Sequence, residues 1–352
     1  MSILIGVGQC GCSVADATLE QLSTHQLEKQ EESDTFSSST FFRQASDGAW
    51  HPRAVLIDTE PKAIEQCVRS RLKRQRSRIQ NDVASPTPQL WSYDPRNSAV
   101  VLGHGGAGNN WAMGYNLMTN PGNDGTSSSN APENVLGAIR REAEQLDSLD
   151  SFCITSSAAG GTGSGLGAGL TEQLRDAFPH VPTLNAVVCP YLVGEVIVQN
   201  YNACLSFAHL AEVSDAVLLL ENQVINGTCT ELLNIKQPSF SDLNKVIGVH
   251  LTSTLLSAAA TLPMSAFTAA EVSRSGGGRS IVGVPLGSHA QRSAPSDKRR
   301  ILTSEEIKPR DGQSRHSLGE DSPAPSPSLT LSDTIGHLCA HPGFKFLTTR
   351  RE

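Results

Sequence analysis

Hydrophobic positions along the chain form short continuous runs, each five to eight residues long. Continuous apolar runs of this length are typical of strands that are buried on both faces of a parallel sheet. The pattern therefore predicts strands at ILIGVG (3–8), AVLID (54–58), SAVVLG (98–103), FCITS (151–155), TLNAVVCP (183–190) and DAVLLLEN (215–222).

Segments with helical spacing lie between these runs. A helix is expected near Ser13–Leu22, after the first strand, and another near Leu166–Leu174, after the fourth. Strands that alternate with helices predict an α/β fold with a doubly wound parallel sheet. Between the third and fourth strands, segment 134–146 places on one face Val135, Leu136, Ile139, Ala143 and Leu146.

A longer helix is expected after the last of these strands. Ser239 and Asp242 have the spacing of a capping box, in which each residue's side chain caps the backbone of the other. The apolar stripe that follows indicates a long, buried central helix. It consists of Leu243, Val246, Ile247, Leu251 and Leu255.

Three segments are poor in residues that could form a core: 23–50, 119–133 and 273–330. The last mixes Gly, Ser and Pro with scattered basic residues, and it cannot bury enough apolar surface to offset its ordering entropy. We therefore divide the chain into a main domain at 1–260, a low-complexity, disordered insertion at 261–330, and a return segment at 331–352.

Composition and charge exclude several classes of protein. The 352 residues carry a net charge of −7, which argues against a protein that coats nucleic acid. No apolar run is long enough to span a membrane. The eight cysteines form no CxxC pair, so the sequence predicts a reduced, cytoplasmic protein without a zinc site. The basic run RSRLKRQRSR at 69–78 is either a solvated surface, a site for an acidic partner or a nuclear localisation signal.

The segment AAGGTGSGLGAG at 158–169 holds six glycines in twelve positions and directly follows a predicted strand. Such a turn into a helix leaves backbone N–H groups free to bind an anion. The lysine of a common phosphate-binding loop is missing, since no lysine lies between Lys73 and Lys236. The alternative is a tight turn that only allows close packing.

Two further glycine loops lie at the same predicted edge. GVGQCG at 6–11 matches the G-x-G-x-x-G pattern of dinucleotide sites, and GHGGAGNNW at 103–111 follows the third strand. At the end of the second strand, Asp58 and Glu60 form either a magnesium-binding pair or a solvated turn. Three glycine loops on one edge are more specific for phosphate binding than any one alone.

Five segments in this order resemble the nucleotide-binding segments of the tubulin family: GQCG (8–11), RAVLIDTEPK (53–62), GGAGNNWAMGYN (105–116), AGGTGSGLGA (159–168) and FSDLN (240–244). GEVIVQNYNACLS and HPGFKFL are most similar to the delta branch of that family. The resemblance covers about 1–260 and 331–352. It implies a Rossmann-like GTPase domain with GTP or GDP and Mg²⁺ as cofactors.

The resemblance also implies a role for each matching residue. Glu60 binds the metal with support from Asp58. Asn222 and Asn244 read guanine, Phe240 stacks on the base, and Glu195 lies on the ribose side. An asparagine amide suits guanine because it offers both a donor and an acceptor. The phosphates are cradled by Gly160, Gly161, Thr162, Gly163 and Ser164, with help from Gly106, Ala107 and Gly108. Gln9 and Cys10 lie near the phosphates and the metal, and Asn109 and Ser157 also belong to the nucleotide site.

The sequence departs from the common tubulins at several positions. Ala159 replaces a glycine, Cys12-Ser13 replaces a polar pair, and Gln199 stands at a position that is usually acidic. The family continues into a second domain, and we expect Glu352 to lie near the first strand of that domain.

The resemblance implies shared catalysis, in which Asp333 acts on the nucleotide of a neighbouring subunit, so that the chain is at most a slow GTPase. The other interpretation of this segment is an N-terminal helix cap at Ser332 or Asp333. The implied partners are other tubulins and microtubules at centrioles or basal bodies, with no nucleic acid and no membrane. The implied location is the cytoplasm and cytoskeleton, with the nucleus as a further possibility.

An NAD(P)-binding Rossmann enzyme is the alternative from a different class, and it rests on the G-x-G-x-x-G match. That alternative lacks a well-placed acidic residue for the ribose and leaves the other two glycine loops unexplained. A bacterial cell-division GTPase of the same superfamily is a variant of the first hypothesis, and GGTGSG and GNNWA favour tubulin over it.

Overall fold

The predicted strands are all present in the computed structural model. It describes residues 1–32, 41–46, 49–80, 91–103, 105–120, 130–194, 196–256, 279–284, 330–339 and 345–351. The strands are β1 (Ser2–Val7), β4 (Ala54–Asp58), β5 (Ala99–Val101), β6 (Ser151–Ser157), β7 (Thr183–Cys189) and β8 (Ala216–Glu221).

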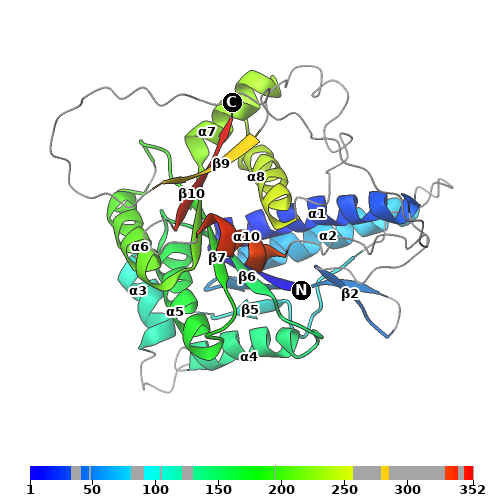
Figure 1. The fold of residues 1–352 in the computed structure, drawn as a ribbon, viewed down its shortest axis with the longest axis horizontal. Helices are drawn as coiled ribbons and strands as arrows, with labels where there is room; N and C mark the ends of the chain where they lie inside the picture. Colours follow the sequence, from blue (N-terminus) through cyan, green and yellow to red (C-terminus); the bar gives the residue numbers. More distant parts are fainter. Residues whose placement is uncertain are drawn as a thin grey trace, which may run out of the picture. The chain divides into compact units, whose positions relative to one another are not determined.

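These strands belong to one sheet with the order β5-β4-β1-β6-β7-β8-β10-β9. All neighbouring pairs are parallel except that of β10 (Phe346–Arg351) with β9 (Arg279–Val284), which is antiparallel. The strand order reverses direction at β1, which lies between β4 and β6. The predicted doubly wound parallel sheet is therefore confirmed (Figure 1).

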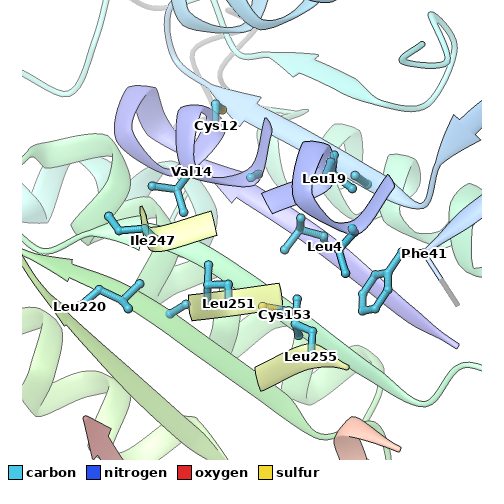
Figure 2. Close-up of a cluster of buried hydrophobic side chains, with 14 of the residues drawn as sticks. Leu4, Cys12, Val14, Leu19, Phe41, Cys153, Leu220, Ile247, Leu251 and Leu255 are labelled. Carbon is cyan, nitrogen blue, oxygen red and sulfur yellow. The ribbon is translucent and has the colours of Figure 1, made fainter. Parts of the chain in front are cut away.

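One face of the sheet is covered by α1 (Gly8–Glu32), α2 (Pro61–Gln80) and α8 (Phe240–Leu255). Their apolar side chains pack on inward residues of the strands, such as Leu4 and Cys153 (Figure 2). Since a Cβ on Gly248 of α8 would lie only 2.9 Å from the carbonyl oxygen of Ala17, the two helices touch backbone to backbone. Figure 2 shows Ile247, Leu251 and Leu255 following the same direction as Cys12, Val14 and Leu19.

The opposite face is covered by α3 (Trp111–Thr119), α4 (Ala131–Ala143), α5 (Gly167–Ala177) and α6 (Gln199–Val213). The predicted stripe of α4 is confirmed, because Val135, Leu136 and Ile139 are buried and the other two residues are partly buried. Because helices cover both faces of the sheet, the loops lie at the two ends of the strands, the carboxyl edge and the amino edge (Figure 1).

The long central helix is also confirmed. In α8 the predicted stripe is buried from Leu243 to Leu255. The side chain of Ser239 accepts from the backbone N–H of Asp242, whose carboxylate accepts from that of Ser239, so the capping box is present. The prediction for the first helix was wrong at its start, since α1 begins at Gly8 rather than near Ser13. Glycines favour loops in sequence analysis, whereas this helix starts inside its glycine motif.

Segment 23–50 contains more core than its composition predicts. The hairpin of β2 (Phe42–Gln44) and β3 (Trp50–Pro52) buries Phe41, Phe42 and Trp50. The ring of Trp91 lies 5.7 Å from that of Phe42. A strand of three residues is too short to show the alternation of apolar and polar positions, so the sequence pattern did not predict β2 and β3.

The basic run at 69–78 lies on α2, and it is not solvated throughout. Arg71 is buried, donates to Asp16 at 3.2 Å and lies 3.8 Å from the centre of the Trp91 ring. Arg69 is exposed and pairs with Glu65. At least one arginine of the run is therefore part of the core contacts of α1 and α2.

The remaining helical elements follow β8 and precede β10. They are α7 (Asn222–Gly227), a π-helical turn at Thr228–Leu232, and α10 (Leu331–Leu338). Strand β9 lies within the predicted insertion at 261–330, where we expected no strand, and that insertion otherwise lies outside the described residues up to Thr330. In the part of the chain that the structure describes, no helix is long and apolar enough to cross a membrane.

Candidate functional site

Loops from β4, β1 and β6 meet at the carboxyl edge of the sheet. These three strands are adjacent, and β1 is the point at which the strand order reverses. Open α/β sheets bind their ligands at this position, because the loops on either side diverge. The predicted phosphate-binding residues follow these strands or β5, except Ser157, which is the last residue of β6.

The first loop is short and lies against the loop after β6. Gly8 has φ +71°, and a Cβ there would lie 2.9 Å from the backbone nitrogen of Gly163. A Cβ on Gly11 would lie 2.1 Å from the carbonyl oxygen of Thr155, so only glycine fits. The first turn of α1 thus begins beside Gly163. It carries Gln9, which is exposed, and Cys10, whose thiol pKa is raised to about 12 by burial.

The loop after β6 enters its helix through a π-helical turn, Thr162–Leu166. No side chain caps this turn at Gly161, so the N–H groups of its first residues are free of side-chain partners. Turns of this kind are often found at functional sites. The hydroxyl of Ser164 is buried and donates to the carbonyl oxygen of Gly160, while Ser157 Oγ accepts from Ala159 N–H at 3.2 Å. Both side chains therefore fix the shape of the loop.

The loop after β5 has an unusual backbone. Gly103, Gly105, Gly106, Gly108 and the non-glycine Asn109 all have positive φ, between +54° and +87°. Side chains other than those of Gly, Asn and Asp strongly disfavour this region. The residue types of this loop are thus required by its conformation.

This same loop lies between Glu60 and the loop after β6. A Cβ on Gly106 would lie 2.6 Å from Glu60 Oε1, and a Cβ on Gly161 would lie 2.7 Å from the carbonyl oxygen of Ala107. A Cβ on Gly160 would lie 3.8 Å from Asn109 Oδ1. The structure therefore brings the predicted glycines together in one cradle of backbone, closed on one side by a carboxylate.

Asp58 and Glu60 differ in environment. Asp58 is buried, and its Oδ1 accepts from Thr59 N–H at 2.7 Å. Burial raises the pKa of Asp58, whereas the backbone N–H groups of Thr59 and Glu60 lower it. The hydroxyls of Thr59 and Thr162 lie 2.9 Å apart and join this turn to the cradle.

The exposed Glu60 is suited to hold a magnesium ion, with Asp58 fixing the turn that carries it. Mg²⁺ usually takes only one or two carboxylates and completes its shell with waters and phosphate oxygens. The described residues contain no group of three His, Cys, Asp or Glu side chains with metal-binding geometry.

The predicted base-binding residues lie at the same edge. Asn222 begins α7 directly after β8, Phe240 begins α8, and Asn244 follows one turn later. Helix α8 runs parallel to α1, and its Gly248 meets Ala17. At about 1.5 Å per residue, α8 starts about 12 Å and α1 about 14 Å before that contact. Phe240 is therefore level with the first turn of α1, and it is 71% exposed. Glu195 lies outside the described residues.

One residue of this edge was missed by the sequence analysis. Asn202 in the first turn of α6 contacts both the loop after β5 and the loop after β6. The one signal in the sequence was that Asn202 lies in the family-like segment QNYNACLS. Its residue type gave no signal, because a single polar residue in a helix is normally exposed.

Asp333 lies at the opposite end of the strands, where the parallel strands begin, which we call the amino edge. It is the third residue of α10, and its carboxylate accepts from the backbone N–H and the hydroxyl of Thr330. These bonds lower the pKa of Asp333. The backbone N–H of the preceding residue, Ser332, donates to Asp150, which lies directly before β6. The cradle lies at the other end of β6, a strand of seven residues that rises about 3.3 Å per residue. Asp333 is therefore about 20 Å from the cradle.

A hollow of about 970 Å³ is also found at the amino edge. One of its cations, Arg43, pairs with Asp94 and with Glu142 Oε1. Arg53 donates to the carbonyl oxygen of Gln145 at 3.4 Å, while Arg53 Nε and Glu142 Oε2 are buried and have no hydrogen-bond partner among the described residues. The hollow is lined by Phe42, Arg43, Gln44, Ala45, Ser46, Trp50, His51, Arg53, Asp94, Pro95, Arg96, Asn97 and Gln145.

The carboxyl edge, in contrast, exposes large apolar side chains. Val193 is 93% exposed and Ile197 95% exposed, in the segment between β7 and α6. Exposed apolar side chains that are close in the sequence, such as these, can contribute to a contiguous patch, and large patches are typical of surfaces that bind proteins, membranes or ligands. Others at this edge are Met113, Leu192, Val198, Tyr201, Leu205, Val224 and Phe240.

Comparison with known proteins shows one family. The profile of the tubulin/FtsZ family GTPase domain matches residues 2–230. The tubulin delta chain of Homo sapiens is 38% identical over 262 residues, which cover 72% of this chain and 52% of the relative. The tubulin delta chain of Canis lupus familiaris is 36% identical over 259 residues, covering 71% and 52%. The chain thus spans about half the length of these relatives.

Proposed function

Because the chain belongs to the tubulin/FtsZ family, we propose that it binds GTP or GDP with Mg²⁺ at the carboxyl edge of its sheet. The observation that carries this proposal is the convergence of the glycine loops. Gly8 meets Gly163, Ala107 meets Gly161, and Gly106 meets Glu60. In this proposal no lysine is needed, because the start of α1 lies against the turn at Thr162–Leu166 and each helix start offers backbone N–H groups to an anion.

The residues have distinct roles in this proposal. The amides of Gly160–Ser164 and Gly106–Asn109 bind the phosphates, with Gln9, Cys10 and Ser157 beside them. Glu60 holds Mg²⁺, supported by Asp58, and the ion supplies positive charge next to the phosphates. Glu195 is on the ribose side. Asn222 and Asn244 pair with guanine, while Phe240 offers an exposed ring for stacking.

We also propose that a second tubulin subunit docks on the carboxyl edge. The exposed apolar segment around Val193 and Ile197 supports this, because it leads into α6, whose Asn202 contacts the loops after β5 and β6. A docked neighbour could present its own Asp333 to this nucleotide, since that residue lies at the opposite edge of the sheet. A carboxylate there could orient the attacking water.

The relatives indicate the setting of this activity. They are tubulin delta chains, and we propose a delta-type cytoskeletal role for this chain, at centrioles and basal bodies in the formation of triplet microtubules and cilia. An NAD(P)-dependent enzyme is not favoured, because the family match and all three glycine loops are explained without it.

Two measurements test the proposal. The nucleotide that copurifies with the protein is identified by mass spectrometry, and a fluorescent GTP analogue is titrated with magnesium or with a chelator. We expect guanine nucleotide in the first, and in the second weaker binding when the metal is removed. An adenine or nicotinamide nucleotide, or no binding of the GTP analogue in either buffer, would contradict the proposal.

A further inference from the structure

Asn202 has an environment that its position on a helix does not explain. It lies in the first turn of α6, only 3% exposed, and it faces the glycine loops rather than the strands. Its neighbour Asn200 is exposed. A buried amide must be paired, and its partners show what it holds in place.

The amide of Asn202 joins three backbone groups. Nδ2 donates to the carbonyl oxygen of Asn109 and to that of Ala159, both at 2.8 Å. Oδ1 accepts from Trp111 N–H at 3.2 Å. An asparagine amide has two N–H donors and a carbonyl acceptor on one planar group, and all are used here.

These bonds tie together loops that come from different strands. Asn109 belongs to the loop after β5 and has φ +54°, a left-handed conformation that asparagine adopts more readily than most residues. Ala159 belongs to the loop after β6, directly before the predicted phosphate-binding glycines. Both carbonyl oxygens point at the same nitrogen, so without Asn202 they would face each other without a donor between them.

The bond to Ala159 also fixes the direction of the next amide. In a planar trans peptide, the carbonyl of one residue and the N–H of the next point in opposite directions. Because the Ala159 carbonyl points to Asn202, the Gly160 N–H points away from α6. This amide is one of those that bind phosphate in the function proposed above.

We propose that Asn202 is a positioning residue, which aims the Gly160 amide and holds the loop at 105–110 against the loop at 158–164. The inference rests on the proposed nucleotide site and adds to it a residue that touches neither phosphate nor base. Its loss should weaken the binding of phosphates and leave the binding of the base intact.

The test uses Asn202→Asp, which keeps the shape and the acceptor but removes both donors. Asn200→Asp is the matched control, since it adds the same charge two residues away at an exposed position. Binding of GTP and of guanosine is measured for each protein. For Asn202→Asp we expect a loss of GTP affinity of about tenfold to a hundredfold, with guanosine affinity within about twofold of the original chain. The control should change neither.

Asn202→Ala repeats the test without added charge, and thermal unfolding reports whether each variant is folded. Equal losses for GTP and guanosine, unchanged GTP affinity, or failure of both variants to fold would overturn the positioning role. If the original chain binds guanosine and GTP equally weakly, the proposed function fails and this inference with it. If the original chain binds GTP tightly and the variants do so too, only this inference fails.

Discussion

The two edges of the central sheet are built differently. At the carboxyl edge, the loops consist largely of glycines, several with positive φ, and the segments around them expose apolar side chains. At the amino edge, several charged groups are paired within the chain. Arg43 pairs with Asp94 and Glu142, and the N-terminal amine of Met1 donates to the carbonyl oxygen of Ser148.

This difference indicates that polar groups stabilise the fold at the amino edge and bind a ligand at the carboxyl edge in the function proposed above. At the amino edge, the ion pairs of Arg43 with Asp94 and Glu142 stabilise the fold, because these side chains are buried or nearly so and would be costly to leave unpaired. At the carboxyl edge, the role proposed above for the backbone amides is to bind a ligand rather than to stabilise the fold. A substitution at one edge should therefore change binding, and a substitution at the other should change the free energy of unfolding.

The largest expected effect is on GTP hydrolysis. In the proposed function, it needs the carboxyl edge of one molecule, which holds the nucleotide, and the amino edge of a second molecule, which supplies Asp333. Since Asp333 lies about 20 Å from its own cradle, an isolated chain should hydrolyse GTP at least about a thousandfold more slowly than a typical enzyme at roughly 10 per second. The measurement is phosphate release over a wide range of protein concentration. Fast release that does not depend on concentration would show that the acid acts within one chain.

The second effect concerns the amino edge alone. Glu142→Leu leaves Arg43 with only Asp94 and removes an acidic neighbour of Arg53, so the free energy of unfolding should fall by about 3 kcal/mol. Denaturant unfolding measures it, with Glu144→Leu, an exposed position on the same segment, as the control. GTP affinity of the folded fraction should not change. A matching loss of affinity would mean that the edges are not separable.

The third effect concerns the cradle. In Gly163→Val, even the first side-chain atom, Cβ, would lie only 3.0 Å from the backbone nitrogen of Ser157. Thr162→Leu adds a larger side chain at the neighbouring position. Blocked amides should weaken GTP binding by about a hundredfold. Gly336→Val on α10 is the control, because a Cβ there meets nothing within 4 Å. Tight GTP binding by the double variant would argue against the cradle.

A smaller effect is expected for base selection. Asn244→Ala should leave a guanine edge unpaired and reduce the preference for GTP over ATP about tenfold. Competition of ATP against a fluorescent GTP analogue measures the preference. Lys245→Ala, which alters the adjacent exposed position, should preserve it. If ATP competes equally with GTP in the original chain, Asn222 and Asn244 do not read guanine.

Much of the fold could be predicted because buried parallel strands are continuous apolar runs. β1, β4 and β6 and the helix α8 were found from such patterns. The hairpin at β2 and β3 and the strands β9 and β10 could not, since they are very short or lie beside a low-complexity segment. Their partners are distant in sequence, and pairing rather than local pattern defines them.

The candidate site shows the same limit. Glycine loops after strands are local signals, so the cradle was predictable. Asn202 was not, because its role depends on two loops that meet only in three dimensions. Arg71 likewise belongs to a basic run by sequence, and only the fold places it between Asp16 and Trp91.

The most direct test of the two edges is amide hydrogen exchange with and without GTP and Mg²⁺. We predict added protection at the carboxyl edge, in 8–12, 105–111, 158–166 and the start of α8, and no change in the hairpin at 41–53. Protection confined to the hairpin and the hollow beside it, or no protection anywhere at saturating GTP, would contradict the claim that the carboxyl edge is the nucleotide site.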